Sequence, residues 1–251
     1  MTDALFDAGV LLSNSRRVVV ATGAGMSKES GIATFRDAQT GLWARYDPQE
    51  LATRRGFALN PALVWTWYAE RRALIERAEP HDGHRALAAL ETYFDSFVIL
   101  TQNIDGLHAA AGSTDIVELH GNIRRAKCFD ANHPAREPYA SGETPPRCHC
   151  GSLLRPDVVW FGEMLDPAHL DRAAELINDC DLLLVVGTSG LVYPAAGFSE
   201  DARRAGKKVI EVNPEKTPVT GIADIWVESG ARDALVELAR RIEHERRRQE
   251  H

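Results

Sequence analysis

The sequence has little cysteine, no long apolar run and no excess of positive charge. Four cysteines in 251 residues are too few for a disulfide framework and fit a reducing compartment. No apolar run approaches the ~20 residues that a membrane-spanning helix needs. The first residues lack the basic start and apolar stretch of a secretory signal. We therefore expect a cytoplasmic protein with no membrane partner.

Acidic residues outnumber basic ones, 36 to 29, which gives a net charge of −7. An acidic chain is repelled by phosphate backbones, so constitutive binding of nucleic acid is not expected. The arginine-rich C-terminal tail is balanced by glutamates and is interpreted as the solvated end of a helix. The length and the hydrophobic fraction of 44% suit one large domain, or one domain with a small insertion.

Short β-branched runs alternate with helical patterns along the chain. Several runs are apolar throughout, which is typical of strands that are covered on both faces of a parallel sheet. The predicted strands are Arg17–Thr22, Ser96–Gln102, Asp115–His120, Asp181–Thr188, Lys208–Asn213 and Asp224–Glu228. The predicted helices are Pro61–Ala78, Gly83–Phe94, Pro167–Asp179, Pro194–Ala205 and Ala231–Arg248. This alternation indicates an α/β fold, a Rossmann-like doubly wound parallel sheet.

Two stretches do not fit the alternation, and we expect them to form a smaller lobe. Residues 36–94 are mostly helical, and residues 121–155 are rich in proline, glycine, cysteine and histidine. The Rossmann-like domain is then made of residues 1–35, 95–120 and 156–251. A cleft between such lobes is a common ligand site.

A glycine loop, Gly23–Ser27, follows the first predicted strand. Glycines there permit a tight turn and let the backbone approach a phosphate closely. The dehydrogenase fingerprint requires another glycine where this chain has Lys28, and an acidic residue at the end of a second strand. No strand is predicted between this loop and Ser96. A hydride-transferring dehydrogenase is therefore disfavoured.

The continuation of this loop, together with further motifs, resembles the sirtuins, the NAD-dependent protein lysine deacylases. The resemblance extends from about Arg17 to Ala231. It rests on Gly23–Arg36, Thr101–His108, Glu118–Gly121, Arg155–Glu163, Gly187–Ser189 and Val212–Glu215. Several long motifs in one order are far more specific than a single glycine loop.

The resemblance implies that NAD is consumed as a co-substrate and that the protein partners carry acylated lysines. The acyl oxygen attacks C1′ of the nicotinamide ribose and nicotinamide leaves. The 2′-hydroxyl then attacks the acyl carbon, which releases lysine and O-acyl-ADP-ribose. Such chemistry needs a general base for a ribose hydroxyl and the exclusion of water.

His120 is the predicted base, because imidazole titrates near neutral pH and the residue ends a predicted strand. A structural histidine at a strand end is the alternative. Asn103 is implied to be catalytic beside it, in the nicotinamide pocket with Asp105. The implied NAD-binding residues are Gly23, Ala24, Gly25, Ser27, Glu29, Phe35, Arg36, Gln102, Asn103, Ile104, Asp105, Gly187, Thr188, Ser189, Asn213, Glu215 and Ala231.

An aromatic, strand-like run is the predicted binding edge for an extended substrate peptide. It comprises Val159, Trp160, Phe161 and Gly162, and Val192 belongs to the opposite edge. Packing of Trp160 and Phe161 in a core is the alternative.

Tyr68 and Arg71 are three residues apart on one predicted helix and share a face. Such a pair can hold a carboxylate through an ion pair and a hydrogen bond. The spacing resembles that of the class III sirtuins, which implies removal of succinyl and malonyl groups as well as acetyl. A surface arginine beside a core tyrosine is the alternative.

The module that binds structural zinc in the family is altered here. Ala131 stands where a second cysteine is expected, and a Cys148-His149-Cys150 run replaces the second pair. Cys128, Cys148 and Cys150 supply three ligands of a zinc-ribbon-like module, and His133 or His149 could supply the fourth. A module that holds without metal is the alternative. Cys180 is predicted to be a buried packing residue.

Two other functions remain open from the sequence. Mono-ADP-ribosylation of protein uses the same NAD pocket without need of the Tyr68 and Arg71 pair. A non-catalytic NAD sensor would not need His120 and Asn103.

Overall fold

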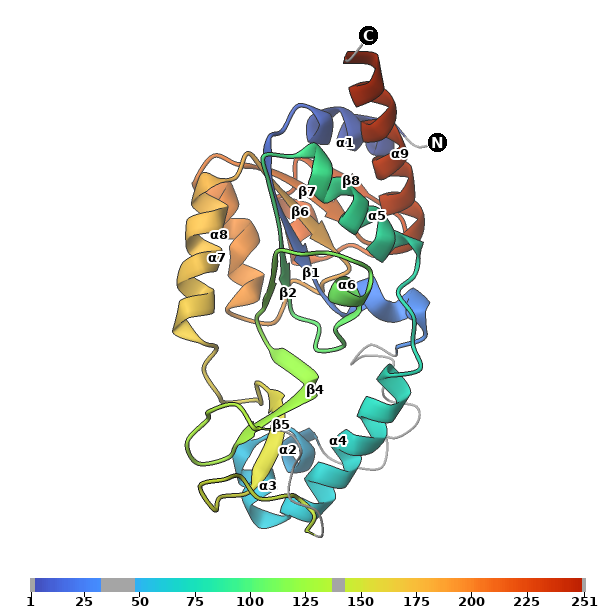
Figure 1. Cartoon of the computed structure of the whole chain (residues 1–251). Helices are drawn as coiled ribbons and strands as arrows, with labels where there is room; N and C mark the ends of the chain where they lie inside the picture. The colour runs from blue at the N-terminus through green and yellow to red at the C-terminus, as the bar shows by residue number, and fades with distance from the viewer. Residues whose placement is uncertain (1–2, 33–47, 137–142, 250–251) are drawn as a thin grey trace.

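A parallel six-stranded sheet forms the centre of the computed structural model, which describes residues 3–32, 48–136 and 143–249 (Figure 1). The strand order is β3-β2-β1-β6-β7-β8. The strands are β1 (Arg17–Thr22), β2 (Ser96–Thr101), β3 (Ile116–Glu118), β6 (Leu182–Val186), β7 (Lys208–Val212) and β8 (Ile225–Val227). Every neighbouring pair in this sheet is parallel. The predicted Rossmann-like fold class is confirmed.

Helices cover both faces of the sheet, which explains why its strands are apolar throughout. Helices α1 (Asp3–Ser13), α5 (Asp82–Leu90) and α9 (Ala231–Gln249) pack against one face, where Val18 and Val20 point. Helices α7 (Pro167–Asp179) and α8 (Phe198–Arg204) cover the other face, where Val19 and Ala21 point. Figure 1 shows the two sets of helices on opposite sides of the sheet.

The smaller lobe lies at one end of the sheet (Figure 1). It contains the antiparallel pair β4 (Gly121–Cys128) and β5 (Leu154–Val158), with α2 (Pro48–Leu51), α3 (Arg54–Leu59) and α4 (Pro61–Ile75). Helix α4 begins where Asn60 accepts a hydrogen bond from the Leu63 amide at 3.2 Å. Trp67, Tyr68 and Trp160 belong to the apolar core of this lobe.

Two elements lie across the predicted lobe boundaries. Helix α5, predicted with the smaller lobe, contributes Leu87 and Leu90 to the core beneath the sheet. Strand β5 begins at Leu154 and pairs with β4. We infer that the chain enters the larger lobe just before α5 and again after β5.

The first predicted strand matches β1 at both ends, whereas the other five run one or two residues too far at their carboxyl ends. Gln102, His120, Thr188 and Asn213 all lie beyond the last paired residue of their strands. These polar side chains leave the sheet at the edge where ligands of doubly wound proteins bind. Strand order reverses between β1 and β6, and loops from either side of this point enclose the site described below.

Among the described residues, no helix combines the length and apolarity that crossing a bilayer requires. The four cysteines all lie in the described part and are free thiols. Cys180 is buried as predicted.

Three buried histidines lie in a row where α5 meets the loop after β1. The rings of His81 and His84 are 4.3 Å apart, and those of His84 and His108 are 5.0 Å apart. Neither ring nitrogen of His84 has a hydrogen-bond partner among the described residues. Burial lowers the pKa of His84 to about 2 and that of His108 to about 4, and the neighbouring histidines add to both shifts.

The buried histidines His84 and His108 predict that the folded protein loses stability in mild acid. The two rings stay neutral in the folded protein, while the unfolded chain takes up protons below pH 6.5. The free energy of unfolding should therefore fall between pH 6.5 and about 4, by about 1–3 kcal/mol per pH unit. Urea unfolding at a series of pH values measures this slope. His84→Leu should flatten it, whereas His169→Leu, on α7, should not. An unchanged slope in His84→Leu would contradict the assignment.

Candidate functional site

The loop after β1 passes the loop after β6 with backbone against backbone. The Gly25 amide donates to the Gly187 carbonyl at 2.8 Å, and the Gly23 amide donates to Val186 at 3.1 Å. A Cβ on Gly25 would lie 2.7 Å from the Gly187 oxygen. Only glycine permits this approach, which starts the short 3₁₀ helix η1 (Ala24–Ser30) at the centre of the sheet edge.

Side chains from η1 and from the end of β2 form a buried polar network. Ser27 donates to the Asp105 carboxylate at 2.7 Å, and Asn103 Nδ2 donates to Ser27 at 3.1 Å and to the Gly23 carbonyl at 3.0 Å. The Leu107 amide donates to the second Asp105 oxygen at 2.8 Å. Burial raises the pKa of Asp105, and these hydrogen bonds oppose the rise. The structure thus brings three predicted site residues together.

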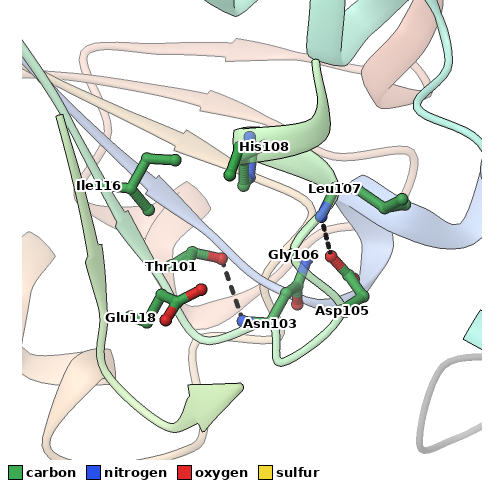
Figure 2. A pocket seen from close by; sticks show the side chains of 9 residues that line it. Thr101, Asn103, Asp105, Gly106, Leu107, His108, Ile116 and Glu118 are labelled. Carbon is green, nitrogen blue, oxygen red and sulfur yellow. Dashed lines mark hydrogen bonds between the residues drawn. The ribbon is translucent and has the colours of Figure 1, made fainter. Parts of the chain in front are cut away.

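The same segment lines a cavity of about 10 Å³ between β2, β3 and α6 (Leu107–Ala110), shown in Figure 2. Its lining includes Thr101, Asn103, His108 and Glu118. Such a volume holds one water molecule at most. This cavity is therefore too small for a nucleotide.

His120, immediately after β3, is held by the end of β2. Its Nδ1 lies 3.0 Å from the Gln102 carbonyl oxygen, which can only accept, so Nδ1 carries the proton and Nε2 is left as an acceptor. Burial lowers the pKa of His120, and the hydrogen bond to Gln102 partly opposes this. A neutral imidazole with a free Nε2 can act as a general base near neutral pH.

Residues after β2, β6 and β7 are joined around Thr188. Gln102 Nε2 donates to the Thr188 hydroxyl at 3.2 Å, and Asn213 Nδ2 donates to the Thr188 carbonyl at 2.8 Å. Ser189 follows on the same loop, and the exposed Glu215 donates its amide to Asn213 Oδ1 at 3.3 Å. These predicted residues therefore form one continuous polar rim at the edge of the sheet, which comprises Gln102, Thr188, Ser189, Asn213 and Glu215.

Other predicted residues have different surroundings. Glu29 accepts from the Arg232 amide at 2.8 Å, which ties η1 to the start of α9 beside the buried Ala231. Ala24 is exposed, and Ile104 is partly buried against the core of the smaller lobe. Phe35 and Arg36 lie outside the described residues.

The aromatic run after β5 is not a strand, because β5 ends at Val158 and the chain turns at Gly162. The Val159 amide donates to the His120 carbonyl at 2.9 Å. Trp160 is only 2% exposed, whereas Phe161 is 50% and Val192 44% exposed. The core-packing alternative therefore describes the Trp160 ring but not Phe161.

Arg155 and Glu163, whose contact the sequence analysis missed, hold this turn. Arg155 is fully buried, pairs with both oxygens of Glu163 and also donates to the Val158 carbonyl. Glu163 accepts from the Trp160 amide at 2.8 Å. Residues of opposite charge at the two ends of the motif Arg155–Glu163 were the available signal, since buried charges are retained only when paired.

Tyr68 and Arg71 both lie on α4, and the charge of Asp105 in the buried network acts on Arg71. Tyr68 is 4% exposed, and its oxygen accepts from Trp160 Nε1 at 3.0 Å. Burial raises the pKa of Tyr68, and the charge of Arg71 opposes the rise. Burial also lowers the pKa of Arg71, against the attraction of Tyr68 and Asp105. Arg71 is thus a partly buried cation between the two lobes.

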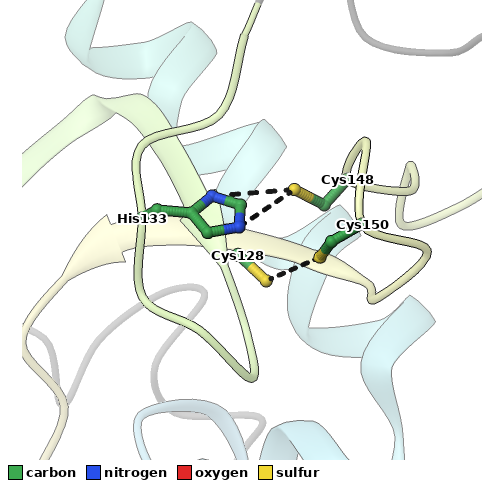
Figure 3. A group of neighbouring side chains, drawn as sticks. All are labelled: Cys128, His133, Cys148 and Cys150. Carbon is green, nitrogen blue, oxygen red and sulfur yellow. Dashed lines mark hydrogen bonds between the residues drawn. The ribbon is translucent and has the colours of Figure 1, made fainter.

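Three thiols and one imidazole meet in the smaller lobe (Figure 3). Ligand atoms of Cys128, His133, Cys148 and Cys150 all lie within 4.8 Å of one another. The sulfurs of Cys128 and Cys150 are 3.5 Å apart, and Cys148 is 3.8 Å from His133 Nδ1. A tetrahedral zinc ion with bonds of ~2.3 Å separates its sulfur ligands by ~3.8 Å. The four residues fit zinc, with His133 in the fourth position.

The fold and the rim of polar residues define a doubly wound α/β protein with its ligand site at the carboxyl edge of the sheet. Residues 23–194 match the model of the Sir2 family. The chain belongs to this family.

Relatives and solved structures agree with this assignment. The NAD-dependent protein deacylase of Aquifex aeolicus is 49% identical over 221 residues, which cover 87% of this chain and 92% of that relative. The NAD-dependent protein deacylase of Mycobacterium tuberculosis (strain ATCC 25618 / H37Rv) is 47% identical over 233 residues, covering 90% and 98%. The crystal structure of a Sir2 homolog–NAD complex has a TM-score of 0.87 at 41% identity, covering 96% and 94%. A Sir2–p53 peptide–NAD⁺ complex has a TM-score of 0.81 at 33% identity, covering 98% of each chain.

The metal centre makes a prediction about its fourth ligand. Purified without chelators, the protein should bind about one zinc ion per chain, as a four-ligand site requires. His133→Ala should lower the zinc content and shift the spectrum of the cobalt-substituted protein, whereas His149→Ala should change neither. Elemental analysis and the cobalt absorption bands measure this. Loss of metal in His149→Ala with retention in His133→Ala would reverse the ligand assignment.

Proposed function

We propose that the protein is an NAD-dependent protein lysine deacylase that releases nicotinamide, O-acyl-ADP-ribose and free lysine. One observation carries the proposal. The neutral imidazole of His120 lies at the edge of the sheet where the Ser27, Asn103 and Asp105 network also ends, and its Nδ1 is tied to Gln102. The kinship to proteins described as NAD-dependent protein deacylases supports it.

The rim supplies the groups that a dinucleotide needs. The glycine loop brings backbone close to where a diphosphate would lie, the position expected after the first strand of a doubly wound sheet. Asn213, after β7, suits the adenosine ribose, and Ser189 and Thr188 suit the phosphate or ribose hydroxyls. Asn103 and Asp105 suit the nicotinamide amide, because they offer a buried amide and a buried carboxylate. Phe35 and Arg36 are assigned to the same ligand by resemblance.

His120 would act as the general base. Its Nε2 accepts a proton from a ribose hydroxyl, while Nδ1 keeps its own proton and donates it in a hydrogen bond to the Gln102 carbonyl. The lowered pKa keeps the ring unprotonated before the transfer. Its own carbonyl accepts from Val159, so the base is connected to the segment proposed to bind the peptide. That segment, Val159–Gly162, and Val192 expose Phe161 and Val192 to an incoming chain.

We also propose that acidic acyl groups such as succinyl and malonyl are removed, in addition to acetyl. Arg71 and the Tyr68 hydroxyl are both buried enough to gain from a carboxylate partner. A charged hydrogen bond is roughly twice as strong as a neutral one, and a desolvated cation gains most from it. Acetyl is smaller and would still enter the same space.

A transferase and a sensor make different predictions for one assay. Incubation with NAD and a succinyl-lysine peptide should release nicotinamide and form O-succinyl-ADP-ribose. Label transferred from NAD to protein, without loss of the acyl group, would support mono-ADP-ribosylation. Intact NAD with every acyl peptide would support a binding module. The position of the buried Tyr68 beside the partly buried Arg71 favours the deacylase, because neither alternative needs this pair.

His120→Ala should abolish deacylation while NAD still binds, because the change removes the base but none of the rim contacts. Turnover by mass spectrometry of an acyl peptide and calorimetric titration with NAD measure the two effects. His169→Ala on α7 is the matched control and should keep full activity. Full turnover by His120→Ala would refute the base assignment.

Arg71→Met should weaken desuccinylation far more than deacetylation. Loss of a buried charged hydrogen bond costs about 2–5 kcal/mol, so the succinyl-to-acetyl ratio of kcat/KM should fall well over tenfold. Arg77→Met, at an exposed position beyond α4, should leave the ratio unchanged. Equal losses for both acyl groups in Arg71→Met would contradict the carboxylate clamp.

A further inference from the structure

We propose that Trp160 is a positioning residue for acyl specificity, which holds the Tyr68 oxygen as an acceptor so that the Tyr68 hydroxyl donates toward the acyl group. The inference rests on the acidic-acyl activity proposed above. On this proposal, Trp160 affects the acyl group by orienting the Tyr68 hydroxyl and does not itself contact the substrate.

The direction of the hydrogen bond between these two residues is fixed by their chemistry. Trp160 Nε1 lies 3.0 Å from the Tyr68 oxygen, and the contact is buried. An indole has one N–H donor and no acceptor. Tyr68 must therefore accept from Trp160, and its own proton has to point elsewhere.

The Tyr68 hydroxyl proton is left in an orientation in which it can donate to the carboxylate of an acidic acyl group. A phenol O–H prefers the plane of its ring, which leaves two positions on opposite sides of the oxygen. Because the indole hydrogen of Trp160 lies against this oxygen, the Tyr68 proton points away from the indole. Arg71 follows three residues later on α4, on the same face, and its charge acts on Tyr68. The Tyr68 hydroxyl and the Arg71 guanidinium can thus both donate to one acyl carboxylate, whereas an acetyl methyl accepts from neither.

Trp160 is held too firmly to turn away. The Arg155 guanidinium carbon lies 3.4 Å from the centre of its ring, and the Phe57 ring is 5.4 Å away. Its backbone amide donates to Glu163, which pairs with the same arginine. The residue is 2% exposed. A side chain fixed in this way costs little entropy when it orients a neighbour.

The test is a double-mutant cycle on the two residues. Trp160→Phe keeps an aromatic ring in the core and removes only the N–H and part of the ring area. The succinyl-to-acetyl ratio of kcat/KM should fall about threefold to tenfold, the range for one lost hydrogen bond. The ratio cancels any general loss from altered packing, because such a loss acts on both acyl peptides. The fall should appear mainly in the KM for the succinyl peptide.

Tyr68→Phe supplies the decisive comparison. If Trp160 acts through the Tyr68 hydroxyl, adding Trp160→Phe to Tyr68→Phe should not lower the ratio further. Trp65→Phe, on the same helix but in the cluster around Cys128 and Cys148, is the matched control and should keep the wild-type ratio. An unchanged ratio in Trp160→Phe, or a full further fall in the double variant, would overturn the inference while the acidic-acyl activity stands. A wild-type protein that removes acetyl but not succinyl or malonyl would overturn both.

Discussion

The backbone contact between the loops after β1 and β6 is the constraint on which the site depends. The hydrogen bond from Gly25 to Gly187 closes the sheet edge at the point where strand order reverses. It starts η1, and η1 delivers the Ser27 hydroxyl to Asn103 and Asp105 at the end of β2. A side chain at either glycine would push the loops apart, since the space for a Cβ is occupied by backbone atoms. The polar network of Ser27, Asn103 and Asp105 is thus a consequence of strand packing. The fold holds these side chains in place before any ligand binds.

The smaller lobe is joined to the edge of the sheet by charge and by hydrogen bonds, two contacts of which reach the proposed site residues. Arg71 on α4 lies in the field of Asp105, and the Val159 amide bonds to the His120 carbonyl. Both contacts cross from the core around Trp160 and Tyr68 to residues at the edge of the sheet. Any movement of the smaller lobe would therefore act on the base and on the carboxylate together, which links the proposed peptide segment to the proposed NAD site.

Sequence reasoning succeeded where one physical signal dominates. Strands buried on both faces have no polar positions, so β1 and β6 were predicted to within two residues at each end. The pair β4 and β5 was missed because its register shifts between Asn122 and Ala126, which destroys the alternation that marks a strand. Sequence spacing also could not choose between His133 and His149, whose rings stack 4.7 Å apart. The burial of Trp160 depends on Arg155 and Phe57, and only the tertiary structure brings these residues together.

The charges of the site explain why two dissimilar substrates would suit it. Asp105 is buried and Arg71 is partly buried, and the two groups have opposite charges. Burial raises the pKa of Asp105 and lowers that of Arg71, which favours the neutral form of each. On the proposed assignment, the cationic nicotinamide ring of NAD approaches Asp105, while the carboxylate of a succinyl group approaches Arg71. The positive nicotinamide ring would lie beside the negative Asp105, and the negative succinyl carboxylate would lie beside the positive Arg71. Each buried or partly buried charge would then have a partner of opposite sign when both ligands are bound. A neutral acetyl group brings Arg71 no counter-charge, and the positive ring of NAD competes with Arg71 for the attraction of the Asp105 carboxylate.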